Sequence, residues 1–177
     1  RRNKKKYNSF VKKNIRKSDP FVVYSIDASH QWVNEFKLRD DYKMLKEHIK
    51  VSYSDVKTGT FNDRICSYYS NFPNIAADLI YVDAPGMYDI KGSLDGTSFH
   101  NVERVPLAAD LLRIEYLLTP GTIIIVDGRF SNSRFLKNNF QREWSYKENM
   151  SYDFSEFRLI EKPIGRFNKI QNQFRKK

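Results

Sequence analysis

The chain has 177 residues, of which 40% are hydrophobic and 15% aromatic, and this fits one domain with its own hydrophobic core. No apolar run approaches the roughly 20 residues of a membrane-spanning helix. No apolar stretch follows the basic start of the sequence, so we do not expect a signal peptide. Cys66 is the single cysteine, which excludes an internal disulfide and makes a reducing cytoplasm the expected location.

The net charge of +10 is unevenly distributed. Residues 1–17 hold nine Lys or Arg and no acid, and residues 158–177 hold seven Lys or Arg and one acid, which leaves a net charge of −5 between them. Basic ends attract nucleic acid or anionic surfaces, although solvated termini without a partner are the commoner case. We expect a basic N-terminal segment at 1–19, a main domain at 20–169 and a basic tail at 170–177.

The first half of the chain predicts alternating helices and strands. In chain order these are a basic helix at 4–16, a strand at Phe21–Asp27, a helix at Trp32–His48 and a strand at Ile49–Asp55. The expected inner face of the second helix consists of Trp32, Phe36, Met44, Leu45 and Ile49. A loop is expected at Thr58–Thr60 and a short helix at Asn62–Tyr69.

The second half continues the alternation and ends in two strands. The predicted elements are a strand at Ala77–Asp83, a long loop at Pro85–Asn101, a helix at Glu103–Leu118, a strand at Gly121–Asp127, a helix at Asn132–Gln141, and strands at Trp144–Met150 and Phe157–Pro163. Their order predicts an α/β fold: a doubly wound, Rossmann-like and mostly parallel sheet with an antiparallel C-terminal strand pair.

Two of these strands are apolar runs that end abruptly in an aspartate, Asp83 in one case and Asp127 in the other. Runs that are apolar on both faces are typical of buried parallel strands. Ligands of open α/β sheets bind outside the carboxyl ends of such strands. We therefore expect the two carboxylates to face one crevice, from neighbouring strands about 5 Å apart.

These patterns resemble class I S-adenosylmethionine-dependent methyltransferases, and within that superfamily the chain is most similar to small-molecule and sugar O-methyltransferases. The resemblance covers about Pro20 to Lys169. It rests on the strand ending at Asp27, on Asp78–Gly86, on Arg104 at the start of a helix, on Pro120–Arg129 and on the closing strand pair. It implies a sheet of order 3-2-1-4-5-7-6, S-adenosylmethionine as cofactor and a small-molecule substrate.

The resemblance also implies roles for three acids in binding the cofactor. Asp27 lies where the family binds the two ribose hydroxyls. One carboxylate can accept the hydrogen bonds of both hydroxyls. Asp55 would lie near the adenine, and Asp83 near the transferred methyl group. The plainer alternatives are a solvated acid at a strand end for Asp27 and ordinary loop chemistry for Asp55.

Other residues are candidates for binding or activating the substrate. Asp83, Asp127 and His100 could orient a substrate hydroxyl or accept its proton. Arg104 and Arg129 could bind an anionic group of the substrate in bidentate fashion, or they could pair with the two acids.

A divalent metal is the less favoured alternative. Carboxylate and amide oxygens such as those of Asp83, Asp127 and Asn132 suit Mg²⁺. Asp127 is followed by Gly128-Arg129, however, where the metal-dependent branch of the family usually has adjacent Asp-Asn. We therefore expect no metal.

One part of the resemblance is missing. No Gly-x-Gly precedes Asp27, and Gly59 is the first glycine. We expect the first strand and its Gly-rich loop to lie upstream, so that the strands ending at Asp27 and Asp83 flank a gap. Direct pairing of these two strands, a strand from another chain, or self-association are the other ways to satisfy the two edges. On this view the 177 residues alone bind the cofactor weakly or not at all. A catalytically inactive remnant, or a nucleic-acid-binding module using the basic ends, are the alternatives.

Overall fold

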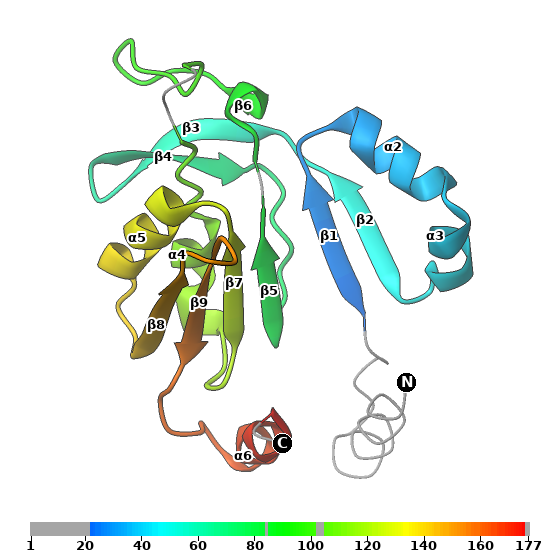
Figure 1. Cartoon of the computed structure of the whole chain (residues 1–177), viewed down its shortest axis with the longest axis vertical. Coiled ribbons are helices and arrows are strands. Elements are labelled where there is room, and N and C mark those ends of the chain that lie inside the picture. The colour runs from blue at the N-terminus through cyan, green and yellow to red at the C-terminus, as the bar shows by residue number, and fades with distance from the viewer. Residues whose placement is uncertain (1–21, 84, 102–104, 176–177) are drawn as a thin grey trace.

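The computed structural model describes residues 22–83, 85–101 and 105–175, which form a mixed α/β structure with strands in three sheets (Figure 1). The predicted helix at 4–16 lies outside the described residues. The described strands do not form the one continuous sheet that the sequence predicted.

The first sheet is a parallel pair of β1 (Val23–Asp27) and β2 (Ile49–Tyr53). Two helices, α2 (His30–Leu38) and α3 (Asp40–Leu45), connect the strands where the sequence predicted one. The helix is interrupted because Arg39 is extended, at φ −65° and ψ 145°, while its guanidinium pairs with Asp41.

The inner face predicted for this helical region is wrong at three of its five residues. Trp32, Met44 and Leu45 are exposed, Phe36 and Ile49 are half-buried, and the buried residue of α2 is Val33. The prediction assumed one continuous helix packed against a covered sheet. The break at Arg39 instead divides this region into α2 and α3, which run in different directions.

The second sheet has the order β4-β3-β6, formed by β3 (Val56–Phe61), β4 (Arg64–Tyr69) and β6 (Ile90–Lys91). Strands β3 and β4 form an antiparallel hairpin, so the predicted loop at Thr58–Thr60 and helix at Asn62–Tyr69 are both wrong. The two turn residues, Asn62 and Asp63, have φ values of 48° and 60°. Asparagine and aspartate tolerate this left-handed conformation, which two-residue hairpin turns require.

The third sheet has the order β5-β7-β9-β8, formed by β5 (Leu79–Val82), β7 (Ile123–Asp127), β9 (Phe154–Leu159) and β8 (Trp144–Asn149). β5 and β7 are parallel, and β9 is antiparallel to both β7 and β8. The predicted antiparallel strand pair at the end of the chain is confirmed.

Helices cover one face of this third sheet. Ile124, Val126 and Phe157 are fully buried and form a core with α4 (Asp110–Ile114) and α5 (Phe130–Asn139). On the opposite face of β5, Leu79 and Tyr81 are 62% and 61% exposed. β5 is therefore buried on one side, whereas the sequence predicted a strand buried on both.

The helix predicted at Glu103–Leu118 is shorter than expected. Its regular part is α4, followed by the 3-10 turn η2 (Glu115–Leu117). The chain before α4 hydrogen-bonds to β4 instead, because Ser67 donates to the carbonyl of Leu107 and accepts from the amide of Ala109. The long predicted loop at 85–101 also contains structure, namely β6 and the 3-10 turn η1 (Met87–Asp89).

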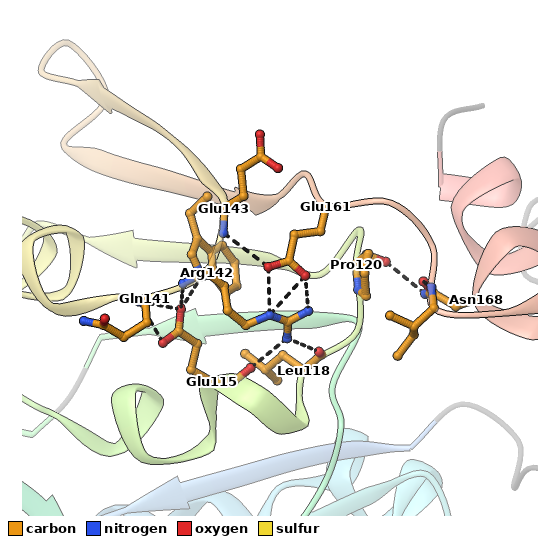
Figure 2. Close-up of polar contacts among 10 residues, drawn as sticks. Glu115, Leu118, Pro120, Gln141, Arg142, Glu143, Glu161 and Asn168 are labelled. Atoms are coloured by element: carbon orange, nitrogen blue, oxygen red, sulfur yellow. Dashed lines mark hydrogen bonds and ion pairs between the residues drawn. The ribbon is translucent and has the colours of Figure 1, made fainter.

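A polar network fixes the end of the third sheet where β7 begins (Figure 2). The buried Glu115 carboxylate accepts hydrogen bonds from the amides of Gln141 and Arg142 and from the indole of Trp144, at 2.9–3.0 Å. The Arg142 guanidinium donates to Glu161 and to the carbonyl of Leu118. The last helix, α6 (Arg166–Arg175), is attached nearby, since Asn168 donates to the carbonyl of Pro120.

Within the described residues, none of the helices has the length and hydropathy needed to cross a membrane.

Candidate functional site

The carboxyl ends of β5 and β7 place two acids at the same edge of the third sheet. The strands are parallel neighbours, with Val82 opposite Val126. Asp83 follows β5 directly, and Asp127 is the last residue of β7. This part of the predicted geometry is confirmed: the two acids leave adjacent parallel strands at the same end.

The two carboxylates differ in their partners. Asp127 accepts a hydrogen bond from the hydroxyl of Tyr81. That bond raises the pKa of Tyr81 to about 12, so the phenol remains a proton donor at neutral pH. The Asp83 side chain is exposed and forms no hydrogen bond or ion pair within the described part of the chain. Of the two, Asp83 is the carboxylate that remains open to a ligand.

Arg129 connects β7 to the segment after β5. Its two terminal nitrogens donate to the backbone carbonyls of Asp83 and Pro85, both at 2.7 Å. Within the described residues it forms no ion pair with Asp83 or Asp127. The guanidinium thus holds the chain that follows β5, and its role in binding an anionic substrate stays a prediction. Arg104 lies outside the described residues.

Asp27 ends β1, in the first sheet. Its Oδ1 accepts from the amide of Ser29 at 2.7 Å, just before α2. The neighbouring Ile26 and Ala28 pack against a second core cluster that includes Tyr69 of β4. Asp27 is close enough to Tyr69 that its negative charge helps to raise the pKa of that phenol, after the larger effect of burial.

Tyr69 links this first-sheet acid to the third-sheet edge. Asp110 also raises the pKa of the phenol, and the positive charge of Arg129 acts in the opposite direction. The charges of Asp27, Asp110 and Arg129 therefore all act on this one buried phenol. Among the residues that the structure describes, its buried hydroxyl has no hydrogen-bond partner.

Asp55 is engaged by other side chains. It accepts a hydrogen bond from the Tyr53 hydroxyl at 2.6 Å and forms an ion pair with Lys91. The bond from Lys91 is the main reason why the pKa of Asp55 lies below its usual value. The contacts connect the end of β2 to β6, as a structural ion pair does. The predicted role near the adenine remains a prediction.

The imidazole ring of His100 is held by a hydrogen bond to the backbone. Nε2 lies 2.8 Å from the carbonyl oxygen of Ile90, which can only accept, so Nε2 carries a proton in this contact. Nδ1 is the nitrogen left for proton transfer. The ring of Tyr88 lies 6.3 Å from that of His100. The structure shows no contact between His100 and the acids at the sheet edge.

Sequence reasoning missed Tyr69 and Asp110. Tyr69 fell within the wrongly predicted helix, and Asp110 is 4% exposed in a region that looked amphipathic. The Asn62-Asp63 pair between two short runs rich in β-branched and aromatic residues was the available signal for the hairpin. No local signal marked Asp110, because its partner, the amide of Tyr69, lies 41 residues away.

Among the residues that the structure describes, no three His, Cys, Asp or Glu side chains gather in a way that could hold a metal ion. No family model, curated protein or solved structure matches this chain.

Proposed function

We propose that this chain is a methyltransferase-like domain that transfers a methyl group from S-adenosylmethionine to a hydroxyl of a small molecule or sugar. The strand order of the third sheet carries the proposal. In β5-β7-β9-β8, two parallel strands are followed by an antiparallel strand inserted before the last one. This is the order 4-5-7-6 that the resemblance implies, and the parallel pair β1-β2 would correspond to strands 2 and 3.

The positions of the acids support this proposal. Methyl transfer is a displacement at a sulfonium carbon, so the protein mainly has to align donor and acceptor. Asp83 is exposed beyond β5 and would orient the acceptor hydroxyl. Asp27 keeps one carboxylate oxygen on Ser29 and would present the other to the ribose. Both would act through hydrogen bonds to the charged form of the carboxylate.

The doubly wound arrangement would be completed by one more strand, between β1 and β5. In Figure 1 the arrows of β1, β2, β5 and β7 all point the same way, and no described strand pairs with the outer edge of β1 or of β5. Unpaired edges beside exposed apolar residues such as Tyr24 and Leu79 favour addition of a strand. The same polypeptide or another chain would supply this strand and the Gly-rich turn that follows it.

Calorimetric titration with S-adenosylmethionine tests the proposal. We expect weak or no binding to the 177 residues alone, and binding to the longest natural polypeptide that contains them. In that polypeptide Asp27→Ala should weaken binding by roughly 2–4 kcal/mol, since charge-assisted hydrogen bonds to the ribose are lost.

Two further variants separate binding from folding. Asp27→Asn keeps an oxygen for the amide of Ser29 but loses the charge, and it should still weaken binding. Glu35→Ala removes an exposed carboxylate from α2, the helix that follows, and should leave binding unchanged. Unaltered affinity in both Asp27 variants would remove Asp27 from the cofactor site, and absence of binding to the longer polypeptide would refute the proposed activity.

A second candidate is a non-catalytic module that binds nucleic acid through its basic ends. Helix α6 favours it, because Arg166 and Lys169 are exposed there and the sequence Arg166–Arg175 contains no acid. This candidate predicts that RNA or DNA binding falls steeply with salt and does not respond to Asp27→Ala. The opposite result, salt-insensitive cofactor binding that depends on Asp27, supports the methyltransferase-like domain.

A further inference from the structure

Helix α6 lies beyond the end of the third sheet at which β7 begins (Figure 1). It is attached there through Asn168, which is 5% exposed, donates to the carbonyl of Pro120 at 3.0 Å and accepts from the amide of Ile164 at 3.2 Å. Pro120 precedes β7, whereas Asp127 is the last residue of that strand. This end of the sheet is therefore opposite to the site proposed above.

Large apolar side chains are exposed on α6 and on the chain that leads into it. Ile164 and Phe167 are 66% and 57% exposed, and Ile160, which follows β9, is exposed as well. The buried Asn168 marks the face of α6 that meets the sheet. Because successive helical residues are rotated by about 100°, Phe167 lies to one side of that face. Several large apolar residues exposed together mark an interaction surface, whereas single ones do not.

Basic residues alternate with these apolar residues along the chain. The exposed ones are Lys162, Arg166 and Lys169. Within the described part of the chain, their side chains form no ion pair and no hydrogen bond. Glu161, the acid next to them in the sequence, is already paired with an arginine. Residues 162–177 contain six Lys or Arg and no acid, so the positive charge at this end of the chain is not compensated locally.

The charge and the apolar side chains together limit what can cover this surface. Residues 1–17 carry nine Lys or Arg and no acid, so they would be repelled from it, as would the same surface of a second copy. A nucleic acid has the required charge, but it binds through phosphate contacts and stacking on aromatic rings, to which Ile160 and Ile164 contribute nothing. An anionic lipid surface offers both negative headgroups and an apolar layer below them.

We propose that this end of the chain binds the surface of an anionic lipid bilayer. The binding surface, named here the C-terminal patch, consists of Ile160, Lys162, Ile164, Arg166, Phe167 and Lys169. The apolar side chains enter the boundary between headgroups and acyl chains, and the charged groups contact the headgroups. The inference does not depend on methyl transfer, because the acids at the ends of β5 and β7 lie at the opposite end of the sheet.

Flotation of the full chain with lipid vesicles tests the proposal. The vesicles consist of phosphatidylcholine alone, or of phosphatidylcholine and phosphatidylserine in equal parts. We expect binding to the anionic vesicles to be at least tenfold tighter than to the neutral ones and to weaken as salt is added. Absence of binding to the anionic vesicles, or equal binding to both kinds, overturns the proposal.

Variants locate the contact, because basic residues elsewhere in the chain also attract anionic vesicles. Ile164→Ser and Phe167→Ser replace exposed side chains, so both are expected to fold, and the double variant should bind at least tenfold more weakly because apolar burial is lost. Tyr152→Ser is the matched control. Tyr152 is 77% exposed in the turn between β8 and β9, at the end of the sheet where β7 ends. The control should bind like the unmodified protein, and a double variant that does the same overturns the proposal.

An oligouridine RNA separates a lipid surface from a nucleic acid as the partner. Titrated at the same ionic strength, it should bind the double variant as tightly as the unmodified protein, because phosphate contacts do not require the two apolar side chains. If the double variant instead loses RNA binding and keeps vesicle binding, the C-terminal patch contacts nucleic acid and the proposal is overturned.

Discussion

Replacing Glu115 with alanine removes the acceptor that three N–H groups share at the start of β7. The carboxylate is 2% exposed, and its donors are the amides of Gln141 and Arg142 and the indole of Trp144 (Figure 2). These donors belong to the chain that leads from α5 into β8. Without the carboxylate these part-buried donors would lose their acceptor, next to a cavity of the size of the lost side chain.

The magnitude follows from these contacts. Hydrogen bonds to a charged group contribute about 1.5–3 kcal/mol each, but release of a buried charge to water offsets part of this contribution. We expect Glu115→Ala to lower the free energy of unfolding by about 3–5 kcal/mol, against a typical total of about 5–15 kcal/mol. Glu115→Gln keeps one oxygen in place and should lower it by about 1–2 kcal/mol.

Urea denaturation followed by tryptophan fluorescence measures both changes. Glu143→Ala is the matched control, because the Glu143 carboxylate points away from the network in Figure 2 and its side chain is exposed. The control should remain within about 0.5 kcal/mol of the unmodified protein. A Glu115→Ala variant that matches the control would show that the network contributes little and would refute the reasoning.

The remaining predictions concern the region between the sheets. Tyr69→Phe should raise the free energy of unfolding by about 1 kcal/mol, because it removes an unsatisfied buried hydroxyl; a loss of stability on urea denaturation would contradict this. Burial raises the pKa of Asp110 from 3.8 to about 7, so the carboxyl binds a proton more tightly in the folded protein than in the unfolded chain. Its contribution to the stability of the folded protein is therefore complete below about pH 4 and is lost as the pH rises through about 7. Thermal unfolding across this range should show a decline that Asp110→Asn reduces, and an equal decline in both proteins would exclude Asp110 as its source. Arg129→Gln should speed hydrogen exchange at the amide of Gly86 by roughly tenfold, since two bonds from a charged donor are lost, while Arg134→Gln should leave that amide unchanged.

Local patterns in the sequence were sufficient for the strands that end in acids and for the closing strand pair. A short apolar run rich in β-branched residues and followed by a polar turn favours a strand over a helix. Two such strands joined by a crossover are parallel neighbours in most folds, which places Asp83 and Asp127 at one edge. A short turn between Trp144–Asn149 and Phe154–Leu159 leaves antiparallel pairing as the simple solution.

Tertiary structure decided which faces are covered and which polar groups meet. β5 reads as apolar on both faces, yet only the packing of α4 and α5 determines that Leu79 and Tyr81 are exposed. The ion pair of Asp55 with Lys91 joins residues 36 apart, and the bond of Tyr69 to Asp110 joins residues 41 apart. No local periodicity encodes such contacts, because they depend on how separate elements are oriented in space. The sequence alone therefore predicts the acids at the sheet edge, whereas the bond between Tyr69 and Asp110 exists only once the chain has folded.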